Sequence, residues 1–140
     1  MDAQQIHKVY LYRRIVLAKL YIDNNYPNKI DLDDIASEAS FSKYHFIRLF
    51  KKAYGKTPHQ YLTWVRLENS KSRLASGASV TETCSSVGFE EVSSFIHLFK
   101  RENLITPAAY QSQQLDRKLK MEKDPLRFIP GCFADQKGWK

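Results

Sequence analysis

Apolar residues recur at helical spacing in two separate stretches of the chain. Residues 46–50 read Phe-Ile-Arg-Leu-Phe, with large apolar side chains at i, i+3 and i+4, and residues 95–99 repeat that spacing. Each pattern has the period of a helix rather than the alternation of a strand. The sequence therefore predicts two long helices, one over residues 42–54 and one over residues 91–103.

An internal repeat relates these two stretches. The segment 46–52, Phe-Ile-Arg-Leu-Phe-Lys-Lys, returns 49 residues later at 95–101 as Phe-Ile-His-Leu-Phe-Lys-Arg. Thr57-Pro58 returns at Thr106-Pro107 with the same offset. Two copies are too few for a solenoid, which needs three or more repeats to bury its faces. The repeat therefore predicts two similar modules that share one core.

Helix punctuation gives each module the same order of elements. Asp31 is a candidate N-cap for a short helix, and Ser79-x-x-Glu82 fits a capping box ahead of the equivalent helix. These helices are expected to stop at Ser40-Phe41 and at Gly88-Phe89, where glycine suits a positive backbone dihedral. A short helix, a tight turn and a longer helix form the helix-turn-helix pattern.

A linking helix is predicted between the modules, from Pro58 to about Ala75, with a stop near Gly77. Its 18 residues would span roughly 27 Å, and successive major-groove faces lie ~34 Å apart, so this connector would set the modules one helical turn apart. The domain organisation we expect is an N-terminal helix with the first helix-turn-helix over 1–56, the linking helix over 57–78, the second helix-turn-helix over 79–112 and a C-terminal extension over 113–140.

Charge is distributed unevenly along the 140 residues. The chain has 22 Lys and Arg against 15 Asp and Glu, a formal net charge of +7. Residues 41–76 carry eight basic side chains against Glu68 alone, whereas residues 80–112 carry two basic and four acidic ones. A charge run is often only a solvated face. Within a helix-turn-helix it points to a polyanionic partner.

Several short motifs then match a known pattern. They are Tyr21-Ile22-Asp23-Asn24-Asn25-Tyr26, Leu32-x-x-Ile35-Ala36, Phe50-Lys51-Lys52-x-x-Gly55-Lys56-Thr57-Pro58-x-x-Tyr61, Arg66-Leu67, Val87-Gly88-Phe89, Phe95-x-x-x-Phe99-Lys100 and Thr106-Pro107-x-x-Tyr110. Residues from about 13 to 111 thereby resemble the DNA-binding domain of the AraC/XylS transcription regulators. The resemblance implies an all-α fold of about seven helices with two homeodomain-like helix-turn-helix units. It also implies a monomer that reaches two major-groove segments of promoter DNA and activates through RNA polymerase.

The resemblance maps base contact in the first module onto Tyr44, Ile47 and Arg48. Arg48 could fork onto guanine O6 and N7, while Tyr44 and Ile47 offer apolar contact to a thymine methyl or a sugar edge. Lysines on or beside the same helix suit phosphates, which position a protein without reading sequence. These are Lys51, Lys52 and Lys56, and Lys43 is a further DNA-binding candidate on the same face of the helix. The alternatives are an ion pair for Arg48 and packing on a neighbouring helix for Tyr44 and Ile47.

The second module departs from the family pattern. Its equivalent face carries Val92, Ser93, Ser94, Ile96, His97 and Lys100. His97 stands where the family often has arginine, and a neutral imidazole gives one donor instead of a guanidinium fork. Glu90 and Glu91 at the helix start would repel a nearby phosphate. We therefore expect the first module to supply most of the affinity and base reading.

Enzyme chemistry is not expected. Four histidines and two cysteines show no metal-ligand spacing, and neither a phosphate-binding glycine loop nor a nucleophile elbow occurs. Helix-turn-helix units of this family also occur in DNA-alkylation repair proteins, but Cys132 lies in Ile-Pro-Gly-Cys-Phe and lacks their Pro-Cys-His-Arg pattern. Cys84 is expected to pack in the core. We expect no catalytic residue, metal or cofactor.

The remaining expectations concern context. No apolar run approaches the ~20 residues of a membrane span, and no secretory signal begins the chain. About 12 residues precede the match and 29 follow it, so we expect a stand-alone regulator without a small-molecule effector domain. We expect it to act in a bacterial cytoplasm, at the nucleoid. Residues 124–140 either fold back on the domain or form a docking strip. The alternative function is a protein-interaction module whose DNA binding is incidental.

Overall fold

The computed structural model describes residues 2–38 and 42–125, and these residues form seven helices and no strand. The helices are α1 (Ala3–Asn25), α2 (Leu32–Glu38), α3 (Lys43–Tyr54), α4 (Pro58–Ala75), α5 (Val80–Val87), α6 (Val92–Asn103) and α7 (Pro107–Lys123). The predicted all-α architecture of two helix-turn-helix modules joined by a long helix is confirmed. The expected break at Ser40-Phe41, Cys132 and the end of the chain lie outside the described residues.

Side-chain caps start the helices where the sequence predicted them. Asp31 Oδ1 accepts a hydrogen bond from the Asp33 amide at 2.9 Å, and Ser79 Oγ accepts one from the Glu82 amide at 3.1 Å. Thr57 and Gln60 form a reciprocal capping box ahead of α4. These bonds satisfy amides that the first turn of a helix leaves without a partner, so they fix where each helix begins.

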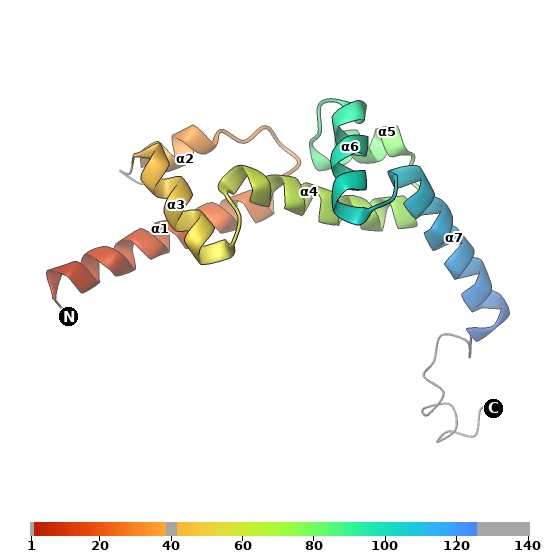
Figure 1. The fold of residues 1–140 in the computed structure, drawn as a ribbon, viewed down its shortest axis with the longest axis horizontal. Coiled ribbons are helices and arrows are strands. Elements are labelled where there is room, and N and C mark those ends of the chain that lie inside the picture. The colour runs from red at the N-terminus through yellow and green to blue at the C-terminus, as the bar shows by residue number, and fades with distance from the viewer. Residues whose placement is uncertain (1, 39–41, 126–140) are drawn as a thin grey trace, which may run out of the picture.

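The prediction of one shared core is wrong, because the buried residues form two clusters. Figure 1 shows the two groups of helices to which they belong, one along each half of α4. The first module buries side chains of α1, α2, α3 and the first half of α4. The first cluster consists of Ile15, Ala18, Ile22, Leu32, Ala36, Phe46, Phe50, Tyr61, Leu62 and Val65. The second module buries Leu67, Leu74, Cys84, Phe95 and Phe99, from α4, α5 and α6. Each module therefore has its own core, and α4 passes through both.

Polar contacts tie α4 to helices at both of its ends. Near its start, Tyr61 Oη donates to Asp23 Oδ1 at 2.6 Å, and Lys19 Nζ lies 2.7 Å from Asp23 Oδ2. Burial, followed by the bond to Asp23, raises the pKa of Tyr61 to about 12. Near its end, Gln111 Nε2 donates to the carbonyls of Leu74 at 2.9 Å and Ala78 at 2.6 Å.

Helix α1 is apolar on two opposite sides. Ile15, Ala18 and Ile22 face the first core. A row of larger side chains on the other side remains 44–58% exposed: Ile6, Val9, Tyr10, Val16, Leu17, Leu20 and Tyr21. Exposed apolar side chains that gather on one side of a helix can mark an interaction surface. Only one of the two apolar sides of α1 is covered within the described part of the chain.

The repeat also predicts a stabilising substitution at Leu104. Gly55 ends α3 and Leu104 ends α6, and both adopt left-handed backbone conformations, with φ of 75° and 68°. A non-glycine residue there costs about 1–2 kcal/mol, and Leu104 is 83% exposed, so its side chain packs against little. We expect Leu104→Gly to raise the free energy of unfolding by about 1 kcal/mol, after the entropy cost of glycine in the unfolded chain. Urea denaturation would measure it, and a loss of stability would contradict the argument.

Candidate nucleic-acid interface

The first candidate recognition element is α3. One side of this helix packs in the first core, and the other side is exposed to solvent. Ser42 Oγ accepts a hydrogen bond from the His45 amide at 3.1 Å and so starts the helix. Phe46 and Phe50 are buried in the first core and fix the rotation of the helix about its axis. Tyr44 and Arg48 lie on the outward side, exposed to solvent. The helix is thus held by its apolar face and presents a polar one.

Tyr44 and Arg48 contact each other on that outward face. Tyr44 is 71% exposed, and the Arg48 guanidinium carbon lies 5.6 Å from the centre of its ring. Such a cation–π contact is worth ~0.5–1 kcal/mol at an exposed site, enough to favour one arrangement of the pair. Tyr44 is too exposed to pack on a neighbouring helix, which was the alternative role for this residue. The pair projects into solvent with its hydrogen-bonding groups open.

Other residues predicted for the first interface are placed less freely. Ile47 is half-buried and packs against the first core, so it offers only part of its surface. Lys43 Nζ lies 2.7 Å from Asp33 Oδ1, although both side chains are exposed. Lys56 Nζ sits 5.5 Å from the ring centre of Trp64. A phosphate contact by Lys43 or Lys56 therefore requires an exchange of partners.

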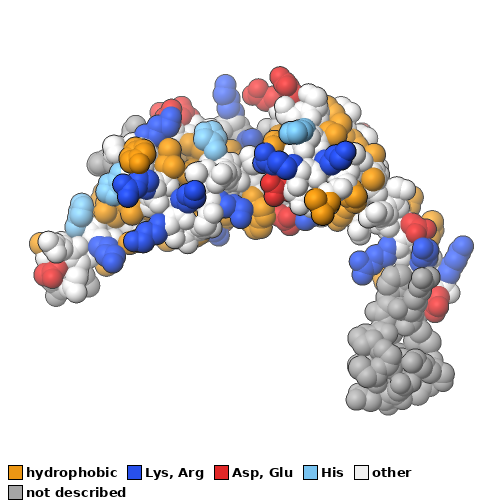
Figure 2. All heavy atoms as spheres, viewed as in Figure 1, with side chains coloured by type: hydrophobic (Ala, Val, Ile, Leu, Met, Phe, Trp, Pro, Cys, Tyr) orange, Lys and Arg blue, Asp and Glu red, His pale blue; other side chains and the backbone are white. Residues whose placement is uncertain are grey.

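Lys51 and Lys52 lie in the last turn of α3 and are exposed. Their charges also suit the negative end of the helix dipole. Figure 2 shows Lys and Arg side chains spread over α1 and α3 on the visible face. The first module therefore presents a basic surface around the outward face of α3.

The second candidate recognition element, α6, has the same anchoring and a different exposed face. Phe95 and Phe99 are fully buried, with an edge-to-face ring contact at 5.9 Å. The outward side chains are exposed: Ser93, Ser94, Ile96, His97 and Lys100. Val92, in contrast, is half-buried and packs against the second core. Val92 therefore offers only part of its surface to an interface.

The start of α6 is acidic. Glu91 occupies the N-cap without making a side-chain cap bond, and its Oε2 instead accepts a hydrogen bond from Ser94 Oγ at 3.4 Å. Glu90 and Glu91 are both exposed. Figure 2 shows acidic side chains at the upper edge of the second module. The two recognition helices thus share a scaffold and differ in the sign of the charge beside them.

Sequence reasoning missed the junction between the modules. Arg66 on α4 donates from Nε to the Tyr26 carbonyl at 2.8 Å and from Nη2 to the Asn28 carbonyl at 3.1 Å. Arg66-Leu67 was recognised as a family motif, but its role at the junction was not predicted, because the partners of Arg66 are backbone atoms some 40 positions away. No local pattern reports a contact of that kind.

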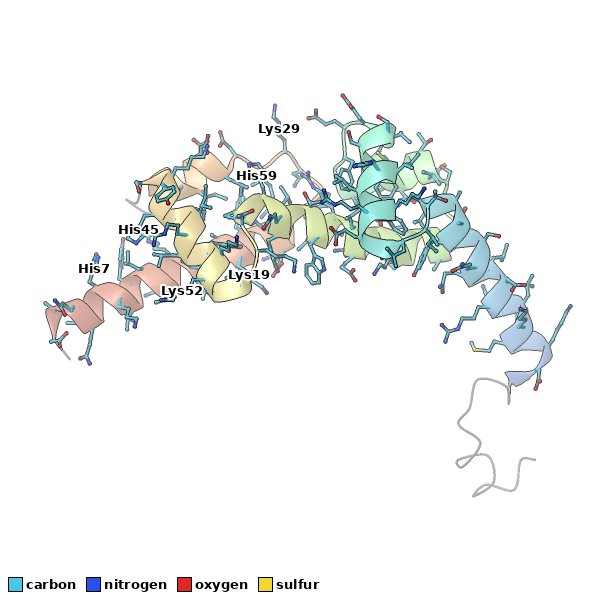
Figure 3. The ribbon with its side chains drawn as sticks, in the orientation of Figure 1. His7, Lys19, Lys29, His45, Lys52 and His59 are labelled. Atoms are coloured by element: carbon cyan, nitrogen blue, oxygen red, sulfur yellow. The ribbon has the colours of Figure 1, made fainter. Side chains whose placement is uncertain are left out.

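Groups that would support other chemistry are not gathered in one place. Figure 3 shows His7, His45 and His59 on three different helices, α1, α3 and α4. Among residues 2–38 and 42–125, no cluster of three or more His, Cys, Asp or Glu side chains could hold a metal ion. Cys84 is buried, and burial raises the pKa of its thiol. In the same described residues, no helix has the length and apolarity to cross a membrane.

Comparison with known proteins places these features in a family. The helix-turn-helix domain family matches residues 35–113, more than half of the chain. A helix-turn-helix transcriptional regulator encoded near cgkA in Pseudoalteromonas carrageenovora is 37% identical over 67% of this chain and 56% of its own length. The transposon Tn10 TetD protein of Escherichia coli is 32% identical over 69% of this chain and 70% of its own length.

The fold is matched by solved structures as well. The DNA-binding domain of AdpA, a global transcriptional factor, was solved in complex with a target DNA and superposes with a TM-score of 0.66. It is 25% identical and covers 74% of this chain and 94% of that domain. AdaA of Bacillus subtilis, a bifunctional transcriptional activator and DNA repair enzyme, is 34% identical over 65% of this chain. The chain spans only 44% of AdaA and 56% of the Pseudoalteromonas regulator. It belongs to the AraC/XylS family of DNA-binding helix-turn-helix transcription regulators.

Proposed function

We propose that the protein regulates promoters by inserting α3 and α6 into adjacent major-groove segments of double-stranded DNA as a monomer. The observation that carries the proposal is the pair of anchored helices with open outward faces, one bearing Tyr44 and Arg48 and the other Ser93 and His97. Bidentate contact from Arg48 to guanine would provide direct reading of a base pair. The AdpA domain, solved on its target DNA, supports this use of the fold.

Within this function, we assign most of the affinity to the first module. Its basic surface matches phosphates, whereas Glu90 and Glu91 stand beside the outward face of α6. Residues 42–65, from the start of α3 to the last residue of α4 in the first core, carry five basic side chains and no acidic one, whereas residues 80–112 have a net charge of −2. The second module would then align the protein on the duplex while reading few bases.

The wider role proposed is transcriptional activation through RNA polymerase, without enzymatic activity, in a bacterial cytoplasm. The support is the family and the bacterial origin of the relatives, one of which is itself named a transcriptional activator. Although AdaA combines regulation with DNA repair, Cys132 lacks the sequence context expected for alkyl transfer.

A second candidate function is a protein-interaction module, favoured by the exposed apolar side of α1. The two functions differ in how DNA binding responds to salt. For phosphate-led binding, log affinity falls by about 0.9 per log unit of salt for each phosphate contacted. An interaction module would bind DNA weakly and show little such slope.

Selection of bound duplexes from a random library, with purified protein at near-physiological salt, tests the proposal. We expect enrichment of a sequence block, with a second block one helical turn away if α6 also reads bases. A single block would support the dominance of the first module. Absence of any enrichment would overturn sequence-specific regulation and leave the interaction module.

A further inference from the structure

Arg66 occupies the point at which α4 passes from one core to the other. Val65 before it belongs to the first cluster, and Leu67 after it belongs to the second. The Arg66 side chain itself is half-buried between the modules. It is therefore placed to contact both modules without belonging to either core.

On the side of the first module, Arg66 holds the segment that follows α1. Its Nε and Nη2 donate to the carbonyls of Tyr26 and Asn28 at 2.8 and 3.1 Å. Tyr26 is the C-cap of α1, where carbonyls carry the negative end of the helix dipole. A charged donor makes shorter and stronger bonds to such acceptors than a neutral one.

On the side of the second module, the same guanidinium meets the turn between α5 and α6. It lies 5.9 Å from the ring centre of Phe89. Burial lowers the pKa of the Arg66 guanidinium, and the charge of Glu90 opposes part of that shift. Gly88 comes so close that a Cβ there would lie 2.9 Å from Arg66 Nε and 2.7 Å from the Tyr26 carbonyl oxygen. The turn of the second module thus touches the loop of the first around this one side chain.

We propose that Arg66, seated against Gly88 and Phe89, is a positioning residue that fixes the orientation of the two helix-turn-helix units and thereby the half-site spacing the protein accepts. The inference rests on the proposed function, since it concerns how α3 and α6 reach DNA together. Helix α4 sets the distance between the modules through its packing in both cores. The Arg66 contacts restrict the bending and twisting of α4 that would still change the relative orientation of the modules. The planar fork of arginine bonds two carbonyls at once, which a lysine cannot reproduce in the same geometry.

The test compares DNA spacing tolerance in the full-length protein and Arg66→Met. Duplexes carry the two selected blocks with zero, one, two or five base pairs inserted between them. We expect the wild-type protein to lose at least tenfold affinity on the first insertion. Arg66→Met should bind the unmodified duplex about tenfold more weakly and lose less than threefold more on insertion. Equal sensitivity of the two proteins to insertion would overturn the proposal.

Two further variants distinguish a positioning role of Arg66 from a general effect of its charge and from a loss of folding. Arg73→Met removes one charge from the exposed side of α4, two turns further on, and should retain the wild-type spacing profile. Binding to a duplex with the first block alone should be unchanged by Arg66→Met, and a loss there as large as on the full site would contradict a positioning role. Arg66→Lys keeps the stem and the charge and should give an intermediate spacing profile; a profile identical to wild type would also count against the fork.

A measurement without DNA keeps this inference distinct from the proposed function. Spin labels at Ala53→Cys on α3 and Ala108→Cys on α7, in a Cys132→Ser background, report the distance between modules; both alanines are exposed. We expect one narrow distance distribution with Arg66, a distribution at least twice as wide with Arg66→Met, and an intermediate width with Arg66→Lys. Unchanged widths would overturn the inference even if DNA selection succeeds. A broader distribution in the Arg66 variants would support the positioning role of Arg66 even if DNA selection returns one block or none.

Discussion

Gly88→Ala should lower the free energy of unfolding by about 3 kcal/mol, because two costs add at one position. Gly88 has a φ of 101°, a left-handed conformation that costs an L-residue about 1–2 kcal/mol. The new Cβ would also stand 2.7 Å from the Tyr26 carbonyl oxygen and 3.0 Å from that of Pro27. Neither oxygen is the end of a flexible side chain, so backbone must move. Chemical denaturation followed by circular dichroism would measure the loss.

Gly77→Ala is the matched control for this prediction. Gly77 has nearly the same φ, 98°, but no atom lies within 4 Å of a Cβ built there. Its substitution should therefore cost only the conformational part, about 1–2 kcal/mol. If the two variants lose the same stability, the close approach between the modules contributes nothing, and the packing described at Gly88 is not maintained in solution.

Arg48→Ala should reduce binding to the preferred duplex by about 10- to 100-fold and flatten the preference among bases at one position. The reason is that the neighbouring Ile47 has no hydrogen-bond donor and cannot replace a guanidinium fork on guanine. His97→Ala should lose less than threefold, because an imidazole cannot form the bidentate fork of a guanidinium and two exposed glutamates stand at the start of the same helix. Fluorescence anisotropy on the selected duplex and on single-base variants would separate the two effects.

Lys51→Ala serves as the comparison for base reading. A residue that contacts only phosphate should weaken binding about equally on all duplexes and reduce the salt slope by about one contact. Arg48→Ala should change the ranking of duplexes instead. Equal losses from Arg48→Ala and His97→Ala would contradict the asymmetry between modules, and uniform weakening by Arg48→Ala would reassign that residue to the phosphates.

Local signals in the sequence were sufficient to place the helices. Asp31, Thr57 and Ser79 act as caps through bonds to amides two or three residues ahead, which sequence spacing reports directly. The apolar period likewise identified Phe50 and Phe99 as core residues, and both are fully buried. These features depend on short-range geometry, so a sequence read alone can specify them.

The candidate interface was less predictable because its details depend on partners far along the chain. The helix period assigned Ile47 and Val92 to the outward faces, but each packs partly against its own core. Lys56 contacts Trp64, and Lys43 forms an ion pair with Asp33. Neither contact can be predicted until the relative positions of the two segments involved are known. The exposed side of α1 was missed for the opposite reason: a helix with apolar residues on both sides gives no clear periodic signal.

The passage of α4 through both cores has a thermodynamic consequence. Two modules on a flexible tether would melt independently, and their order of melting would carry no information about their contact. Here the loss of either core removes the tertiary support from half of a helix whose other half is still packed, and an isolated half of such length is marginal in water. The cooperative unit is therefore larger than one module, and the helix that connects the modules also transmits stability between them.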